Sequence, residues 1–411
     1  MQVPAAAPLD LTYCTNIHPG EGWAEVLQGL RGYAVPLKAA LSPEAPFGIG
    51  LRLSDQAAQE LLEGDALAEA AEFLAAEGLY VALINGFPFG SFHHARVKDE
   101  VFAPDWATDE RLEYTLRLVT ILAELMPEGG DGGISTSPLS YKRWFTDEEK
   151  PDRAAMLANV VQVAEAMAAV ERDAGRLIHL DIEPEPDGLI EDGPEFVAFF
   201  ENELLPLGGP MLAEALGVPL PEAQRLLRRH VRLCYDTCHF SVQYEEFSAV
   251  RAELERVGAS IGRIQVSAAL RVVLPTDPVA RESVGKRLAA FVESTYLHQV
   301  AERHADGSIV HHADLGPALE DIHDPDAIEW RVHFHVPLFA PGFGKLQSTR
   351  DDIPEALQAA QRDGVTSHLE IETYTWDVLP PELKRGLLRS ITSEYEWTLA
   401  ALGLPKAPEE G

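Results

Sequence analysis

Short apolar runs alternate along the chain with longer stretches in which apolar residues recur every three or four positions. The longer stretches, including 58–78, 109–130 and 152–175, have the spacing of amphipathic helices and end at or near glycine, a common helix stop. Strands that alternate with helices predict βα units and a parallel sheet. The apolar runs that we predict as strands are 9–16, 47–53, 79–85, 132–137, 177–183, 231–236, 261–267 and 366–372.

Eight strand–helix units in succession predict an α/β fold of the (β/α)₈ TIM-barrel type. A doubly wound open sheet is the alternative, but no glycine-rich nucleotide-binding fingerprint follows the first strand. Residues 271–340 interrupt the alternation. We therefore expect one domain over residues 1–411, with 271–340 as an insertion after strand seven that folds over the barrel mouth. A separate small domain is the other interpretation of this segment.

The charge of the chain narrows the classes of partner. Its 411 residues include 33 Lys and Arg against 66 Asp and Glu, a formal net charge of −33. Because such a surface repels phosphate, we expect neither a nucleic acid nor an anionic membrane as partner. Three cysteines are too few for a disulfide framework, and we find no secretion signal and no stretch approaching the roughly 20 apolar residues that span a bilayer. These features predict a cytoplasmic enzyme that handles a small molecule.

Polar side chains recur at the ends of the later predicted strands, where a TIM barrel keeps its reacting groups. Strand five ends at Glu183, and strand six ends in an Asp-x-x-His sequence formed by Asp236 and His239. Strand seven places Gln265 between apolar neighbours, and strand eight ends at Glu372. Each residue alone is also explained as a salt-bridged acid, a helix cap or a satisfied buried amide. Together they predict a site for a divalent cation at one mouth of the barrel.

The predicted insertion offers further ligands. His333 and His335 flank Phe334, so in an extended segment both imidazoles face the same side and can bind one ion. Two hydrogen-bonded histidines in an edge strand are the alternative, and the sequence leaves open whether Gln265 or His335 completes the site. The predicted metal ligands are Glu183, Asp236, Gln265, His333, His335 and Glu372.

The first four strands and the loops after them contribute residues suited to a substrate wall. Aromatic side chains with a few hydrogen-bond donors are typical of sites that bind a polyol or a sugar ring. The loop after strand three is rich in both, and packing over the helices is its alternative role. We expect Arg52 to face inward and to pair with one of the acids. The residues predicted to contact substrate are Asn16, His18, Arg52, Phe87, His93, Lys98, Trp106, Lys142 and Glu370.

The strand-end residues resemble the ligand layout of the xylose-isomerase-like barrels, a superfamily of sugar isomerases, ketose epimerases and endonuclease IV. That layout places Glu at strand five, Asp-x-x-His at strand six, His at strand seven and Glu at strand eight, and Gln265 here replaces the strand-seven histidine. The segment HFHVPLFAPGFG is similar to the Asp-x-His stretch of the endonuclease branch, with His333 in place of Asp. The phrases YCTNIHPGEGW, LDIEPEP, YDTCHF and EIETYTWDVLP resemble the metabolite-traffic protein EboE family of this superfamily. The resemblance implies a metal-binding barrel in a small-metabolite pathway with partner proteins.

Three functions fit this pattern. The first is an isomerase or epimerase of a sugar, polyol or related metabolite, in which Mn, Mg, Co or Zn polarises a carbonyl and hydroxyl pair. In that reaction Glu183 or Glu372 transfers the proton and His239 orients the substrate. The second is a metal-dependent hydrolase of a small phosphoester, and the third is a non-catalytic carrier of a metabolite. Whether the chain forms a homo-oligomer is left open for all three.

Overall fold

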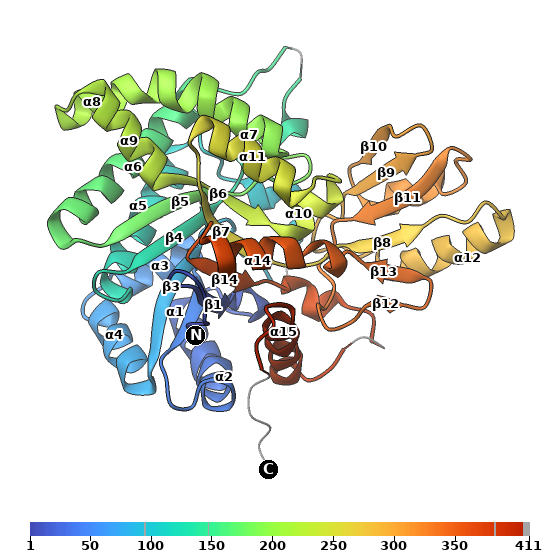
Figure 1. The fold of residues 1–411 in the computed structure, drawn as a ribbon, viewed down its shortest axis with the longest axis horizontal. Helices are drawn as coiled ribbons and strands as arrows, with labels where there is room; N and C mark the ends of the chain where they lie inside the picture. Colours follow the sequence, from blue (N-terminus) through green and yellow to red (C-terminus); the bar gives the residue numbers. More distant parts are fainter. Residues whose placement is uncertain (94–95, 147, 382–383, 406–411) are drawn as a thin grey trace.

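An eight-stranded parallel sheet forms a barrel in the computed structural model, which describes residues 1–93, 96–146, 148–381 and 384–405 (Figure 1). The strand order is β1-β14-β7-β6-β5-β4-β3-β2, and a parallel bridge between Cys14 and Gly50 links the two end strands. This arrangement confirms the predicted (β/α)₈ barrel. The barrel strands are β1 (Asp10–Tyr13), β2 (Phe47–Arg52), β3 (Leu79–Asn85), β4 (Asp131–Thr136), β5 (Leu177–Ile182), β6 (Val231–Asp236), β7 (Ile261–Val266) and β14 (His368–Ile371).

The helices follow the barrel strands as the apolar spacing predicted, with one exception. The stretch 58–78 was expected as a single helix, which is wrong, because the chain forms two helices on either side of Gly64 at a φ of 56°. A left-handed residue cannot continue a helix, and glycine adopts this conformation without steric cost. The helices of the barrel are α1 (Trp23–Gly29), η2 (Leu30–Ala34), α2 (Val35–Leu41), α3 (Asp55–Leu61), α4 (Ala66–Glu77), α5 (Asp109–Leu125), α6 (Arg153–Ala174), α7 (Gly193–Phe199), η5 (Phe200–Gly208), α8 (Gly209–Leu216), α9 (Leu220–His230), α10 (Thr237–Val242), α11 (Phe247–Val257), α14 (Pro354–Asp363) and α15 (Leu387–Ala401).

One helix among the described residues, α6, is long and apolar enough by length and composition to cross a membrane. The sequence-based expectation that no stretch reaches this length was therefore wrong. Half of its apolar window is buried inside the protein, and α6 packs against β5 and α5. Met156, Val160 and Val163 are fully buried there. The apolar character of α6 is accounted for by its packing in the core.

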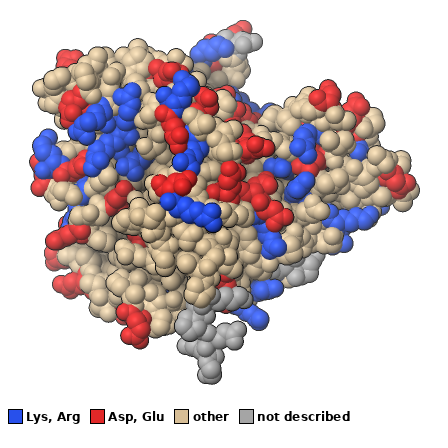
Figure 2. Space-filling view, viewed as in Figure 1, with Lys and Arg blue, Asp and Glu red and all other residues tan. Residues whose placement is uncertain are grey.

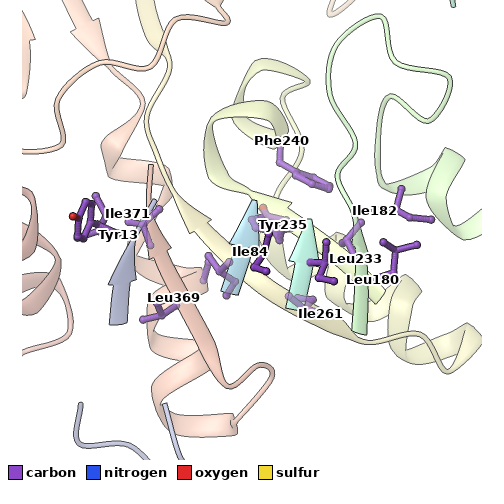
Figure 3. Close-up of a cluster of buried hydrophobic side chains, with 14 of the residues drawn as sticks. Tyr13, Ile84, Leu180, Ile182, Leu233, Tyr235, Phe240, Ile261, Leu369 and Ile371 are labelled. Carbon is purple, nitrogen blue, oxygen red and sulfur yellow. The ribbon is translucent and has the colours of Figure 1, made fainter. Parts of the chain in front are cut away.

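The hydrophobic core lies between the barrel strands and the surrounding helices. Leu180 and Ile182 of β5 and Leu233 of β6 belong to one buried apolar cluster (Figure 3). Because side chains alternate between the two faces of a strand, the residues between them point into the barrel. The outer faces of the strands therefore bind the helices, while the inner faces are free to carry polar groups.

The barrel interior beneath the strand ends is charged. Arg263 of β7 donates from Nε to Asp181 Oδ2 at 3.0 Å and from Nη1 to Glu370 Oε2 at 2.9 Å, and all three side chains are fully buried. Glycines make room for this network, since a Cβ at Gly262 would lie 1.8 Å from Asp181 Oδ1 and one at Gly50 would lie 1.6 Å from Glu370 Oε1. Any larger residue at these two positions would displace the ion pairs.

A second polar cluster closes the amino-terminal end of the barrel. His179 is hydrogen bonded through Nδ1 to Asp181 Oδ1 at 2.5 Å and through Nε2 to Asp131 Oδ1 at 3.0 Å. His368 Nε2 reaches the same Asp131 oxygen at 2.7 Å. The inner faces of β5 and β14 are thus polar along their whole length.

The chain between β7 and β14 builds a second, antiparallel sheet that stands to one side of the barrel (Figure 1). Val97 N and Lys98 N each donate to Thr295 O at 2.8 Å, which ties this segment to the loop after β3. That 271–340 is an insertion in a single domain stays a prediction. The elements of the segment are β8 (Leu270–Val273), α12 (Pro278–Leu288), η6 (Ala289–Phe291), β9 (Val300–His304), β10 (Ile309–His312), α13 (Leu315–Ala318), η7 (Leu319–Asp321), β11 (Ala327–Val332), β12 (Gly342–Phe343), β13 (Leu346–Ser348) and η8 (Arg350–Asp352).

Acidic and basic side chains are interspersed on the face shown in Figure 2. Helix α9 carries several arginines, and two of them are in ion pairs: Arg225 with Glu222 at 2.7 Å and Arg229 with Glu171.

Candidate metal centre and substrate cavity

A cavity opens where the carboxyl ends of the barrel strands meet. Its floor is formed by strand-end residues, and its walls come from the loop after β3 and from the segment between β7 and β14. The lining residues are Asn16, Asn85, Phe87, Pro88, Phe92, Val97, Lys98, Val101, Glu183, Glu185, His239, Tyr296, Leu297, His333, Glu372 and Tyr374.

Three carboxylates gather at the strand ends, and two of them, Glu183 and Glu372, line the cavity. Glu183 follows β5, Asp236 ends β6 and Glu372 follows β14, and each is at most 4% exposed. Burial raises the pKa of Glu183 well above its usual range, and the neighbouring Asp236 raises it further. Burial likewise raises the pKa of Glu372, with Glu183 and Asp236 adding to the effect. Buried acids that raise one another's pKa values form a site with a high affinity for positive charge.

The two carboxylate oxygens of Asp236 have different surroundings. Its Oδ1 accepts from Cys238 N at 2.7 Å, from His239 N at 3.1 Å and from Ser267 Oγ at 2.6 Å, which caps α10 and fixes the carboxylate plane. Its Oδ2 is buried without a hydrogen-bond partner among the described residues. Burial raises the pKa of Asp236, but His239, His335 and these hydrogen bonds outweigh burial and lower it. The carboxylate is therefore held ionised with one oxygen directed to the site.

Three histidines present their Nε2 atoms to the same region. His239 Nδ1 lies 3.0 Å from Pro184 O, and His335 Nδ1 lies 3.0 Å from Glu372 O. A carbonyl oxygen can only accept, so both Nδ1 atoms carry the proton and both Nε2 atoms keep a lone pair. His333 Nδ1 is held in the same way by Gln299 Oε1 at 2.8 Å. Burial is the main cause that lowers the pKa of all three, to about 4 for His335, which keeps the imidazoles neutral.

These donor atoms fit a divalent cation. Asp236, His239 and His335 each offer one ligand atom, and the three atoms lie within 4.8 Å of one another. Glu183 Oε2, Asp236 Oδ2 and His335 Nε2 are all buried acceptors that lack a hydrogen-bond partner in the part of the chain described. Leaving a buried polar atom unpaired is costly, and a cation bound here would give these atoms a partner. Mixed carboxylate and imidazole ligands suit Zn, Mn or Co better than Mg.

Glu372 is fixed by two amides. Its Oε1 accepts from Asn16 Nδ2 at 2.8 Å and from Asn85 Nδ2 at 3.0 Å, and both asparagines line the cavity. Asn16 was predicted as a substrate contact, and its side-chain Oδ1 is buried without a partner among the described atoms. The two amides thus orient Glu372 and leave one amide oxygen for another group.

Gln265 and His335 were alternative predictions for the last ligand. Gln265 Oε1 accepts from Cys234 Sγ at 2.9 Å, so its oxygen is already engaged, while the free amide atom is a nitrogen that cannot bind a cation. His335 Nε2 has a free lone pair. The geometry favours His335.

Of the predicted substrate contacts, Asn16, Phe87 and Lys98 line the cavity. His93 lies behind it, with Nε2 2.6 Å from Asn16 O. Glu370 lies deeper, paired with Arg263. Glu370 therefore belongs to the charged interior rather than to the cavity.

The four remaining predicted contacts, like His93 and Glu370, lie outside the lining. Trp106 is fully buried and donates to Thr136 Oγ1 at 3.0 Å, because the loop after β3 turns back into the core there. Lys142 pairs with Glu191 at 2.6 Å and with Glu195 at 2.8 Å. We do not propose these side chains as substrate contacts.

The other two are His18 and Arg52. The ring of His18 stacks on Tyr33 at 4.3 Å between centroids. Arg52 was expected to pair with a site acid, but it binds Glu21 Oε2 at 2.9 Å and Gly20 O at 3.0 Å at the edge of the barrel. The inward-facing cation is Arg263 instead, which shares the β7 face with Gln265.

Four residues that line the cavity were not predicted from the sequence: Asn85, Glu185, Tyr296 and Tyr374. Asn85 ends a predicted strand and could have been found by the same rule that found Glu183. Tyr296 lies in the irregular segment after β7, where no periodicity indicates which side chains face the barrel.

No protein-family model and no curated protein matches the chain. Solved structures of similar fold include the probable 3-DHS dehydratase AsbF from Bacillus anthracis, with 11% identity and a TM-score of 0.41 over 95% of this chain and 98% of that chain. A second is the IolI protein with a bound zinc atom, with 11% identity and a TM-score of 0.41 over 98% and 100%. A third is D-allulose 3-epimerase from Methylomonas sp. in complex with D-allulose, with 14% identity and a TM-score of 0.36 over 72% and 85%.

Proposed function

We propose that the protein is a divalent-metal-dependent isomerase or epimerase of a small hydroxylated carbonyl compound. The proposal rests on buried acceptor atoms without hydrogen-bond partners among the described residues: Glu183 Oε2 at the cavity, and Asp236 Oδ2 and His335 Nε2 in a ligand group with the cavity-lining His239. An enzyme of this type needs a cation beside a carboxylate that can take a proton, and these residues offer ligand atoms for the one and the carboxylate for the other.

Glu183, Asp236, His335 and Glu372 would hold the ion, with Nε2 of His239 beside it. Asp236 Oδ2 lies 3.9 Å from His239 Nε2, close enough for both to reach one centre. When bound, such an ion polarises a carbonyl and hydroxyl pair and lowers the barrier to removing the adjacent proton.

The chain's own residues supply the proton transfer. Glu183 Oε2 faces the cavity without a partner among the described residues, and burial raises the pKa of this group, so it can hold a proton between two steps. Glu372 is held rigidly by Asn16 and Asn85 and is the second candidate base. His239 lines the cavity and orients the substrate. The aromatic walls exclude water from the reacting groups.

The ligand layout supports a place among the xylose-isomerase-like barrels. The resemblance of several sequence phrases to the EboE family supports a role in small-metabolite traffic, with partner proteins of that pathway. Both assignments are part of the proposal.

A hydrolase of a small phosphoester is a second candidate, favoured by one observation. Glu185, His239 and His333 form another group whose ligand atoms lie within 4.8 Å of one another, and all three are buried. Many enzymes that hydrolyse phosphoesters bind two adjacent cations. The number of ions bound per chain therefore separates the two candidates.

The test combines metal analysis with proton exchange. The protein is loaded with Mn, Co or Zn, and its metal content is measured for wild type, Glu183→Gln, Glu372→Gln and the exposed control Glu63→Gln. A panel of ketoses and hydroxyketones in deuterated water then reports exchange of the proton next to the carbonyl.

We expect one ion per chain in wild type and in the control, reduced metal content in both site variants, and exchange with at least one compound. Two ions per chain with phosphoester hydrolysis would support the hydrolase instead. Metal binding without exchange would favour a carrier. Unchanged metal content in both site variants would refute the site.

A further inference from the structure

The outer half of the cavity is an aromatic wall. The rings of Phe92, Tyr296 and Tyr374 form a mutual cluster with centroid distances of 5.1 Å, 5.0 Å and 5.4 Å. Phe87 and Leu297 continue the apolar lining. These residues come from three separate segments of the chain, and all line one cavity. A wall of this kind favours an apolar group on the ligand.

The inner half of the cavity is polar and acidic. Asn16, Asn85, Glu183, Glu185 and Glu372 line it. A ligand that reaches the floor must therefore present hydroxyl or carbonyl groups there. The cavity has a polar end and an apolar end.

The described lining offers no free receptor for an anion. Lys98 is the one lysine or arginine among those lining residues. Its Nζ is paired with Asp314 Oδ2 at 2.5 Å and donates to Glu293 O at 3.2 Å. Its charge is thus compensated from within the protein, while the acids of the floor repel a phosphate or a carboxylate.

We propose that the substrate is an uncharged, amphipathic molecule, with a hydroxyketone or diol at one end and an aromatic or branched apolar group at the other. This inference rests on the proposed function, because the polar end is assigned to the metal centre. It excludes sugar phosphates and sugar acids as substrates.

Four probes that differ in charge and in tail test the proposal by calorimetric titration of the metal-loaded protein. Hydroxyacetophenone is neutral with an aromatic tail, and its para-carboxylate adds a negative charge. Dihydroxyacetone is neutral without a tail, and dihydroxyacetone phosphate is anionic without one. We expect hydroxyacetophenone to bind at least about tenfold more tightly than dihydroxyacetone, because burying an aromatic ring contributes at least the roughly 1.4 kcal/mol of binding free energy that corresponds to a tenfold change in Kd. Each anionic probe should bind at least about tenfold more weakly than its neutral partner.

The variant Asp314→Asn provides the matched test of the charge argument. Asn keeps the Oδ1 acceptor used by His298 N and Leu315 N but removes the charge that compensates Lys98. The anionic probes should gain about tenfold in affinity in this variant, while the neutral probes change by less than about twofold.

Tighter binding of either anionic probe than of its neutral partner by wild type would overturn the inference. So would loss of all probe binding by a protein that still holds its metal, a result that leaves the metal centre intact. A protein that takes up no metal would refute the proposed function itself, and that outcome is read from the metal content before any probe is added.

Discussion

Replacing Asp236 with asparagine should lower stability without metal and lower it further when metal is present. Asn retains the Oδ1 that accepts from Cys238 N, His239 N and Ser267 Oγ, so the cap of α10 is preserved. It replaces the unpaired Oδ2 with an amide that can donate to the neighbouring acids. The change therefore removes one buried negative charge and one metal ligand while leaving the fold of the strand end unchanged.

The structure sets the size of both effects. Because His239, His335 and its hydrogen bonds lower the pKa of Asp236, the ionised carboxylate stabilises the folded state, and its removal should cost the metal-free protein about 1–3 kcal/mol. Metal at about 1,000 times its Kd stabilises wild type by about 4 kcal/mol. Loss of a ligand should weaken binding at least about 100-fold, which at the same metal concentration leaves about 1.5 kcal/mol. For 411 residues the unfolding entropy is about 0.9 kcal/mol/K. The loss of the carboxylate therefore corresponds to about 1–3 °C in Tm, and the stabilisation by metal to about 5 °C in wild type and about 2 °C in the variant.

The assay is thermal unfolding of chelator-treated and metal-loaded protein at matched concentrations. Asp152→Asn is the control, because Asp152 caps α6 by accepting from Ala155 N and does not line the cavity. It should lower Tm slightly and equally in both conditions. Asp236→Asn should melt about 1–3 °C below wild type without metal and about 4–6 °C below it when metal is present.

An increase in Tm on metal addition that is as large in Asp236→Asn as in wild type would refute the assignment of Asp236 as a ligand. That result would mean that Oδ2 binds no cation.

Three further predictions concern the interior and the supports of the site. Arg263→Met should lower the free energy of unfolding in urea by about 3–5 kcal/mol, because it leaves two buried carboxylates without their cation. Adding Glu370→Gln should recover part of the loss. A cost below about 1 kcal/mol would show that the ion pairs of Arg263 do not stabilise the barrel interior. Gln299→Leu removes the acceptor that fixes the proton on His333 Nδ1, and because His333 is outside the proposed ligand set, metal affinity in a competition titration should change by less than about twofold; a tenfold loss would show that His333 binds the ion. Burial raises the pKa of Glu394 to about 7, so the folded state binds this proton more tightly than the unfolded state. Wild-type stability should therefore be fully present below the unfolded pKa and fall as pH rises toward 7, whereas Glu394→Gln should lack this slope; an identical pH profile would contradict it.

The sequence contains enough information to predict the barrel because its outer strand faces must be apolar. Strands 79–85 and 231–236 were predicted residue for residue, and α5 and α6 begin within one residue of the predicted positions. The division of 58–78 into two helices was missed, because Gly64 is a tolerable residue in a helical pattern until its backbone conformation is known.

The residues at the floor of the cavity could also be predicted from the sequence, because parallel strands bring their carboxyl ends together. The same rule of alternation that selected Gln265 should have selected Arg263, two residues earlier on the same face. The walls were not predictable, because Tyr296 and Leu297 reach the cavity through irregular chain whose path only tertiary packing determines. Arg52 shows the converse error. The alternation of side chains placed it inside the barrel, but it forms an ion pair with Glu21 at the barrel edge.

The most direct test of the metal centre is anomalous X-ray diffraction from crystals of the wild-type protein soaked with zinc or manganese and measured at the metal absorption edge. The account predicts one anomalous peak within bonding distance of Glu183, Asp236, Glu372 and Nε2 of His335. A peak elsewhere, such as the Asp131 cluster at the other end of the barrel, or no peak at all from protein that folds normally, would contradict it.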